Sequence, residues 1–356
     1  MVNAPTLTIT LRASLIAALL FAFIVTGPLA AQDNTQNAAP TPTYDPTDPD
    51  AAFPVGEELT IAALRELEIE GSAIVFEQRL ANGPSYAQYL ASYISEGNKI
   101  YGLLTIPFGD VPEGGFKAIV FNHGYIPPET YVTTERYVAY VGTLASHGFV
   151  VFKIDMRGHG NSEGEAQGSY FSPGYTIDAI AALKSLQKLD IVDPDGIGMW
   201  GHSMAGNLVL RAMLIEPDIK AGVIWAGAVY SYDDFTTYRI SDVSFVRDDN
   251  DEAQTERRRR SREIFDTYGE PSTASPYWQA VSLTANIDYL QSPVQLHHAL
   301  DDTVVNIGYA NDLSTVLLAH DKPFELYQYA GGGHNIDSPY FEDAILRTIT
   351  FFQKYL

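Results

Sequence analysis

The sequence predicts an α/β fold with a mostly parallel central sheet, helices on both faces and an antiparallel hairpin at its start. Residues 85–106 alternate apolar and polar around Glu96-Gly97-Asn98, a pattern typical of a β-hairpin. Short, almost fully apolar runs follow, which suit strands that helices cover on both faces. These runs are 118–121, 149–154, 197–200, 221–226 and 294–296, and the last strand candidate is 324–329.

Helical patterns separate these runs. Residues 175–189 carry isoleucine and leucine at helical spacing, residues 207–215 favour a second helix, and residues 340–355 form an amphipathic one. A hairpin followed by alternating strands and helices predicts an α/β sheet with an antiparallel edge.

The polar, charged segment 235–280 interrupts this alternation. A structureless loop of that length is unusual, so we expect a helical insertion or a lid. Its stretch ERRRRSRE (256–263) places Glu256–Arg260 and Arg259–Glu263 at i,i+4 spacing, which predicts a solvated helix. The alternative is a lid that presents Arg258 or Arg259 to an acidic substrate. Tyr277 and Trp278 are candidates either for pocket walls or for core.

The first 54 residues differ from the rest. Arg12, the apolar run 15–25 and the small residues Ala30-Ala31 are typical of a signal peptide (1–31), which predicts a secreted or periplasmic protein. Eleven apolar residues are short for a membrane span, and retention as an anchor is the alternative. Residues 32–54 contain five prolines and predict a disordered linker, which leaves 55–356 as the catalytic domain.

Composition narrows the chemistry. The chain has no cysteine, which excludes disulfides, thiolate metal sites and a cysteine nucleophile. A net charge of −22 makes nucleic acid a poor partner. We expect no cofactor and no metal.

Ser203 in MWGHSMAG (199–206) is the candidate nucleophile. A strand precedes it and a helix follows, which is the setting of a sharp turn that exposes a serine. The motif G-x-S-x-G needs small residues two positions before and after the serine. Gly201 and Ala205 meet this need, although the second glycine stands one residue late, at Gly206. The alternative is a chance serine in a glycine-rich turn.

A serine hydroxyl needs a general base, and an acid to orient that base. Downstream of Ser203 the histidines are His297, His298, His320 and His334. His334 follows the final strand in the glycine-rich YAGGGHNI and is the candidate base, whereas His320 is expected at the surface. Asp301 and Asp302 end the preceding strand. Adjacent residues on a strand point to opposite faces, so we expect core or supporting roles for His297 and His298.

An oxyanion needs two backbone N–H groups. Met204 follows the nucleophile and supplies one. Tyr125 in FNHGY (121–125) follows an early strand and supplies the other, while His123 shapes that turn.

These motifs, with FKIDMRGHGNSEG (152–164) and LHHALDDTVV (296–305), resemble the α/β-hydrolase superfamily, and within it the prolyl-oligopeptidase-like and esterase-like serine hydrolases. The resemblance implies the α/β-hydrolase fold, Ser203 as nucleophile, His334 as base, and Tyr125 and Met204 as oxyanion donors. The family pattern H-G-x-x-D-x-x-V-P, laid on His298, selects Asp302.

The chain departs from that pattern at Ala299 and Asn306, so Asp301 stays an alternative acid. The loop that contains Arg157 is scaffold in this family, and we expect Arg157 to form a structural ion pair.

The expected chemistry is acyl transfer through an acyl-enzyme. The expected partner is a small-molecule ester, with a short peptide as the alternative substrate and a non-catalytic binding protein on the same scaffold as a distant one. Only about 50 residues (55–106) precede the first core strand, which favours esters over a peptidase with a large gating domain.

Overall fold

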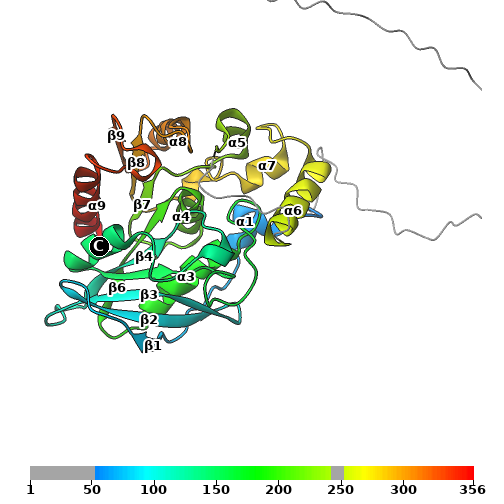
Figure 1. The fold of residues 1–356 in the computed structure, drawn as a ribbon. Helices are drawn as coiled ribbons and strands as arrows, with labels where there is room; N and C mark the ends of the chain where they lie inside the picture. Colours follow the sequence, from blue (N-terminus) through cyan, green and yellow to red (C-terminus); the bar gives the residue numbers. More distant parts are fainter. Residues whose placement is uncertain (1–52, 242–251) are drawn as a thin grey trace, which may run out of the picture. The chain divides into compact units, whose positions relative to one another are not determined.

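A single mixed sheet organises the protein (Figure 1). The computed structural model describes residues 53–241 and 252–356; the predicted signal peptide and residues 32–52 of the predicted linker lie outside them. Within the described residues the sheet has nine strands in the order β1-β2-β3-β5-β4-β6-β7-β8-β9. Their bounds are β1 Val75–Arg79, β2 Tyr86–Ser95, β3 Asn98–Pro107, β4 Phe116–Asn122, β5 Val150–Ile154, β6 Val192–His202, β7 Gly222–Trp225, β8 Val294–Ala299 and β9 Phe324–Tyr329.

The predicted hairpin is present as β2 and β3. Ser95 pairs with Asn98, so the turn consists of Glu96 and Gly97, both with positive φ (46° and 81°). Two successive positive φ values are the geometry that matches the twist of a tight hairpin. β1, which the sequence pattern did not reveal, pairs antiparallel with β2 as an exposed edge strand.

The strands from β4 to β9 are mutually parallel, and each overlaps one of the predicted strand candidates. β6 begins earlier than expected, at Val192, because Val192 pairs with Phe116 at the start of β4. This confirms the α/β-hydrolase fold, whose parallel strands bring their carboxyl ends to one edge of the sheet.

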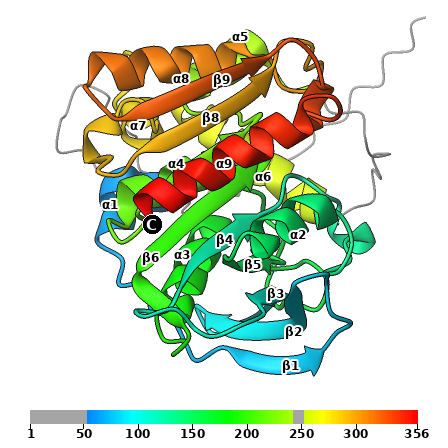
Figure 2. The same cartoon turned by 90° about the vertical axis from the view of Figure 1, so that its left-hand side faces the viewer.

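Helices cover both faces. The main ones are α2 Val138–Ser146, α3 Gly174–Leu186, α4 Met204–Ile215, α8 Gly308–Ala319 and α9 Phe341–Tyr355. Figure 2 shows α2 and α9 on one face, whereas α3, α4 and α8 pack on the other. On α9, Ile345, Ile349 and Phe352 recur at helical spacing and are buried against the sheet, as the amphipathic pattern predicts.

The segment 235–280 is a helical insertion in its described part. It contributes α6 Glu252–Tyr268 and α7 Pro276–Val281, preceded by α5 Tyr232–Tyr238, while residues 242–251 lie outside the described residues. Tyr277 and Trp278 are buried in a separate aromatic cluster with Leu59 from the start of the described chain. Both residues are therefore core. No helix among the described residues has the length and apolarity to cross a bilayer.

Candidate active site

Ser203 occupies a strained turn between β6 and α4. Its backbone has φ 56° and ψ −120°, a region that non-glycine residues rarely adopt. A Cβ on Gly201 would lie 2.6 Å from the Ala205 carbonyl oxygen, so only glycine fits there. A Cβ on Gly206 would lie 2.6 Å from the Cα of Gly227. The late glycine thus serves the packing of α4 on its neighbour, and the fully buried Ala205 fits beside Ser203.

Met204 and Tyr125 lie where the sequence predicts them. Met204 is the first residue of α4, and its amide is one of those that a helix leaves without an intrahelical partner. The positive end of the α4 dipole lies at this same N-terminus, next to Ser203. Tyr125 follows β4, the strand next to β6 in the sheet.

Asp302, and not Asp301, contacts the imidazole of His334. The Asp302 Oδ2 lies 2.8 Å from the His334 Nδ1, and the Asp302 side chain is fully buried. Asp301 is exposed and accepts a 2.8 Å hydrogen bond from the amide of Gly333. Asp301 therefore holds the loop that carries His334 but does not touch its ring.

Hydrogen bonds keep the buried Asp302 carboxylate ionised. Burial by itself raises the pKa of Asp302, but hydrogen bonds from His298, His334 and the Val305 amide hold that pKa well below its usual range. The Val304 and Val305 amides donate to Oδ1 at 2.8 and 3.0 Å. The side chain is thereby fixed in the orientation that it needs to bind His334.

The loop after β9 positions His334 from above the sheet edge. Gly332 and Gly333 have φ values of 106° and 59°, which a side chain would strain. The carbonyl of His334 accepts a 2.9 Å hydrogen bond from the Nε2 of His202, the residue before Ser203. No hydrogen bond within the described residues joins the Ser203 hydroxyl to the His334 ring. Such bonds often form fully only when substrate binds.

The remaining downstream histidines have supporting places. His298 lies 3.3 Å from Asp302, whereas the adjacent His297 points to the other face and contacts Tyr329 and Gln295. His320 is exposed at the end of α8, as predicted. Among the described residues no group of three or more acidic, histidine or cysteine side chains could hold a metal ion.

Arg157 forms the predicted structural ion pair. Its guanidinium binds Asp178 on α3 through Nε and Nη2 at 3.0 and 2.7 Å, and also contacts Glu96 in the β2–β3 turn. His123 donates to the carbonyl of Gly124 and stacks on a tyrosine ring, and burial lowers its pKa to about 3. Both residues shape the loops around the site.

Comparison with known proteins identifies the family. Residues 136–356 match the prolyl oligopeptidase family, S9 peptidases. The chain belongs to the prolyl oligopeptidase family. It is therefore a serine hydrolase.

Individual relatives include both peptidases and esterases. The chain is 27% identical to the uncharacterized peptidase YtmA of Bacillus subtilis, over 79% of this chain and 99% of that protein. The acetyl xylan esterase from Paenibacillus sp. R4 superposes with a TM-score of 0.61 at 19% identity, over 83% of this chain and 92% of the esterase. Dipeptidyl peptidase 4 of Porphyromonas gingivalis gives 0.59 at 19%, over 76% of this chain but 36% of the peptidase.

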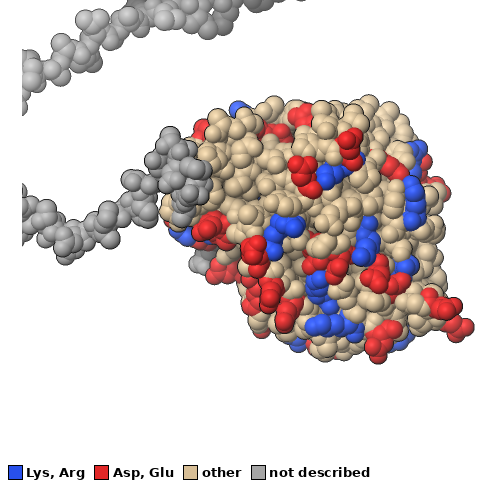
Figure 3. Space-filling view, turned by 180° about the vertical axis from the view of Figure 1, so that it is seen from behind, with Lys and Arg blue, Asp and Glu red and all other residues tan. Residues whose placement is uncertain are grey.

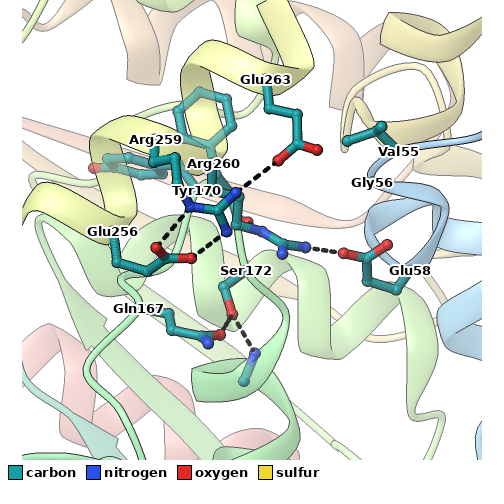
Figure 4. Close-up of polar contacts among 12 residues, drawn as sticks. Val55, Gly56, Glu58, Gln167, Tyr170, Ser172, Glu256, Arg259, Arg260 and Glu263 are labelled. Atoms are coloured by element: carbon teal, nitrogen blue, oxygen red, sulfur yellow. Dashed lines mark hydrogen bonds and ion pairs between the residues drawn. The ribbon is translucent and has the colours of Figure 1, made fainter. Parts of the chain in front are cut away.

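In this member of the family the arginines of α6 have different partners (Figure 4). Arg259 binds Glu256 at 2.6 Å and Glu263 at 3.2 Å on the helix surface. The predicted Glu256–Arg260 pair is wrong, because Arg260 turns toward the body of the protein and binds Glu58 and the Phe171 carbonyl.

Arg257, one turn before Arg260, lies next to the loop that contains Gly124 and Tyr125, called the oxyanion loop below. Its guanidinium carbon lies 5.7 Å from the centre of the Tyr125 ring, and its Nη1 donates to the Ala166 carbonyl at 3.0 Å. The hypothesis that Arg258 or Arg259 faces an acidic substrate stays a prediction, and Arg257 is a third candidate because it lies beside Tyr125. On the face seen in Figure 3, acidic and basic side chains are interspersed.

Proposed function

We propose that this serine hydrolase cleaves carboxylic esters by a triad of Ser203, His334 and Asp302. The observation that carries the proposal is the 2.8 Å contact between His334 Nδ1 and the buried Asp302 carboxylate. The loop that carries His334 is in turn hydrogen-bonded to His202, the residue before Ser203. Acyl transfer requires a buried, ionised acid that orients a histidine toward the nucleophile, and here the loop of that histidine is bonded to the residue before the strained Ser203.

The proposed reaction follows from the tautomer that Asp302 imposes. Nδ1–H donates to Asp302, so the lone pair on Nε2 of His334 is available to take the Ser203 proton. Ser203 attacks the ester carbonyl, and the Tyr125 and Met204 amides stabilise the oxyanion. His334 then protonates the leaving alcohol. Water, deprotonated by His334, hydrolyses the acyl-enzyme and regenerates Ser203.

The substrate is proposed to be a small ester, with a short peptide as the second candidate. The chain spans 92% of the acetyl xylan esterase, which supports an ester. Family membership and the similarity to YtmA support a peptide. We also propose export from the cytoplasm, on the basis of the predicted signal peptide at 1–31.

A substrate panel tests this function. We expect purified protein to hydrolyse p-nitrophenyl acetate and butyrate with a higher kcat/KM than aminoacyl p-nitroanilides, and Ser203→Ala to lose about 10³-fold or more in kcat. A higher kcat/KM for the anilides would instead identify short peptides as the substrate. Equal ester turnover by Ser203→Ala would contradict the triad for both substrates.

A further inference from the structure

A chain of hydrogen bonds joins three loops of the site through two side chains that the proposed mechanism does not use. The amide of Gly124, in the oxyanion loop, donates to the hydroxyl of Tyr137 at 2.9 Å. That hydroxyl lies 2.8 Å from Nδ1 of His202, and Nε2 of His202 lies 2.9 Å from the His334 carbonyl.

The direction of each bond can be assigned. The His334 carbonyl only accepts, so Nε2 of His202 carries the proton and Nδ1 is the acceptor. The Tyr137 hydroxyl therefore donates to His202 while it accepts from the Gly124 amide. Burial lowers the pKa of His202 to about 3, and the imidazole stays neutral in this tautomer at neutral pH.

The surrounding residues leave little room for another arrangement. A Cβ on Gly124 would lie 3.0 Å from the Tyr137 hydroxyl and 3.2 Å from Nδ1 of His202. A side chain at this position would push the Tyr137 hydroxyl or the His202 ring away by a few tenths of an ångström, which glycine avoids. His202 is 3% exposed, and the rings of Tyr137 and Phe121 pack edge to face. Tyr137 has a φ of 51° and directly precedes the first residue of α2.

We propose that Tyr137 and His202 are positioning residues. They hold three segments in fixed relative positions: the loop with Gly124 and Tyr125, the turn with Ser203, and the loop with His334. Tyr125 follows Gly124, Ser203 follows His202, and the last bond ends on His334 itself. We call this chain of hydrogen bonds the relay. Each of its ends, and His202 in its middle, is therefore a residue of the proposed mechanism or the direct neighbour of one. A displacement of about 1 Å in such a group can cost up to about 10²-fold in rate. This inference rests on the proposed function.

Removal of one hydroxyl tests the relay. Tyr137→Phe keeps the ring but removes the acceptor for Gly124 and the donor for His202. We expect kcat per active site to fall about tenfold with KM changed by less than about twofold, because donor geometry matters most in the transition state. Active sites are titrated with a fluorophosphonate, which corrects for any misfolded fraction. His202→Leu should give a similar loss, and the double variant should lose no more than the larger single loss.

Tyr93→Phe is the matched control. This substitution also removes a hydroxyl from a buried tyrosine. The Tyr93 hydroxyl donates a 2.8 Å hydrogen bond to the Asp178 carbonyl and so joins β2 to α3. We expect Tyr93→Phe to lower Tm but to leave kcat per site unchanged. Unchanged kcat in Tyr137→Phe, or an equal loss in Tyr93→Phe, would overturn the relay alone. A wild-type protein that neither labels at Ser203 nor hydrolyses esters contradicts the proposed function, and this inference with it.

Discussion

The sheet edge and the helical insertion are held together by different forces. At the sheet edge, Asp302, His202 and His334 are fixed by short hydrogen bonds in buried surroundings. The insertion instead packs through aromatic rings around Tyr277 and Trp278, with arginines bonded to backbone carbonyls. Hydrogen-bond geometry is directional, whereas apolar packing depends mainly on buried area and shape.

This difference separates two roles. The sheet edge fixes the angles and distances that bond making and breaking require, and we expect its variants to change kcat. The insertion adds apolar core and places Arg257 beside Tyr125, so its variants should change stability or substrate preference. The predictions below test that separation.

The adjacent aspartates give the largest expected contrast. Asp302→Asn should lower kcat about 10³- to 10⁴-fold, because an amide at that position favours the wrong tautomer of His334. Asp301→Asn should cost about twofold at most, since Asp301 is exposed and bonds only loop backbone. Steady-state ester hydrolysis by both variants measures the contrast, and equal losses would contradict the assignment of the acid.

The aromatic cluster of the insertion should control stability. Trp278 is 3% exposed, so Trp278→Ala should lower the free energy of unfolding by about 3–5 kcal/mol. Denaturant unfolding measures this loss, and kcat per titrated site should stay within about twofold of wild type. If Trp278→Ala does not fold, Trp278→Phe provides the milder test. A large loss of kcat per site would mean that the insertion also positions the catalytic groups.

The buried histidines should make the protein less stable in acid. Burial lowers the pKa of His297 to about 3, whereas an unfolded chain has a histidine pKa of about 6.5. The stabilising contribution is complete above pH 6.5 and is lost as pH falls toward 3, because only the unfolded state takes up the proton. When the pH falls from 7.5 to 5, the free energy of unfolding of His297→Gln should decrease by about 2 kcal/mol less than that of the wild type. Parallel stability curves would contradict this.

The smallest expected effect concerns substrate charge. Arg257 lies beside Tyr125, whereas Arg259 is engaged with Glu256 and Glu263 on the surface. Arg257→Ala should lower kcat/KM for a carboxylated ester about fivefold relative to a neutral ester, which corresponds to about 1 kcal/mol. Arg259→Ala should leave that ratio unchanged. If Arg257→Ala weakens both substrates equally, the arginine has a structural role only.

Local patterns were enough to predict most of the fold. The apolar runs and the hairpin mark β2 to β9, because buried parallel strands and tight turns leave strong signals in the sequence. β1 left none, since an exposed edge strand such as VFEQR needs no apolar stripe. The sequence does contain a signal for which face of α6 is turned inward. Arg260 and Arg257 lie four and seven residues before the buried Ile264, so all three share one helix face.

Contacts between distant residues could not be predicted in the same way. The choice between Asp301 and Asp302 depends on where β8 ends, and a shift of one residue reverses which side chain points inward. His202 and Tyr137 are 65 positions apart, and no local pattern pairs them. The other site residues, Ser203, Met204, Tyr125 and His334, were predicted because each follows a strand, at the edge where this fold gathers its functional groups. Asp302 was selected over Asp301 by resemblance to the family pattern.

Covalent labelling tests the central claim most directly. The full chain is treated with a fluorophosphonate and digested, and the adduct is located by mass spectrometry, with His334→Ala as the comparison. The account predicts a single adduct on Ser203, formed at least about 10³-fold more slowly in His334→Ala. No adduct, an adduct on another serine, or equal labelling rates in the two proteins would contradict it.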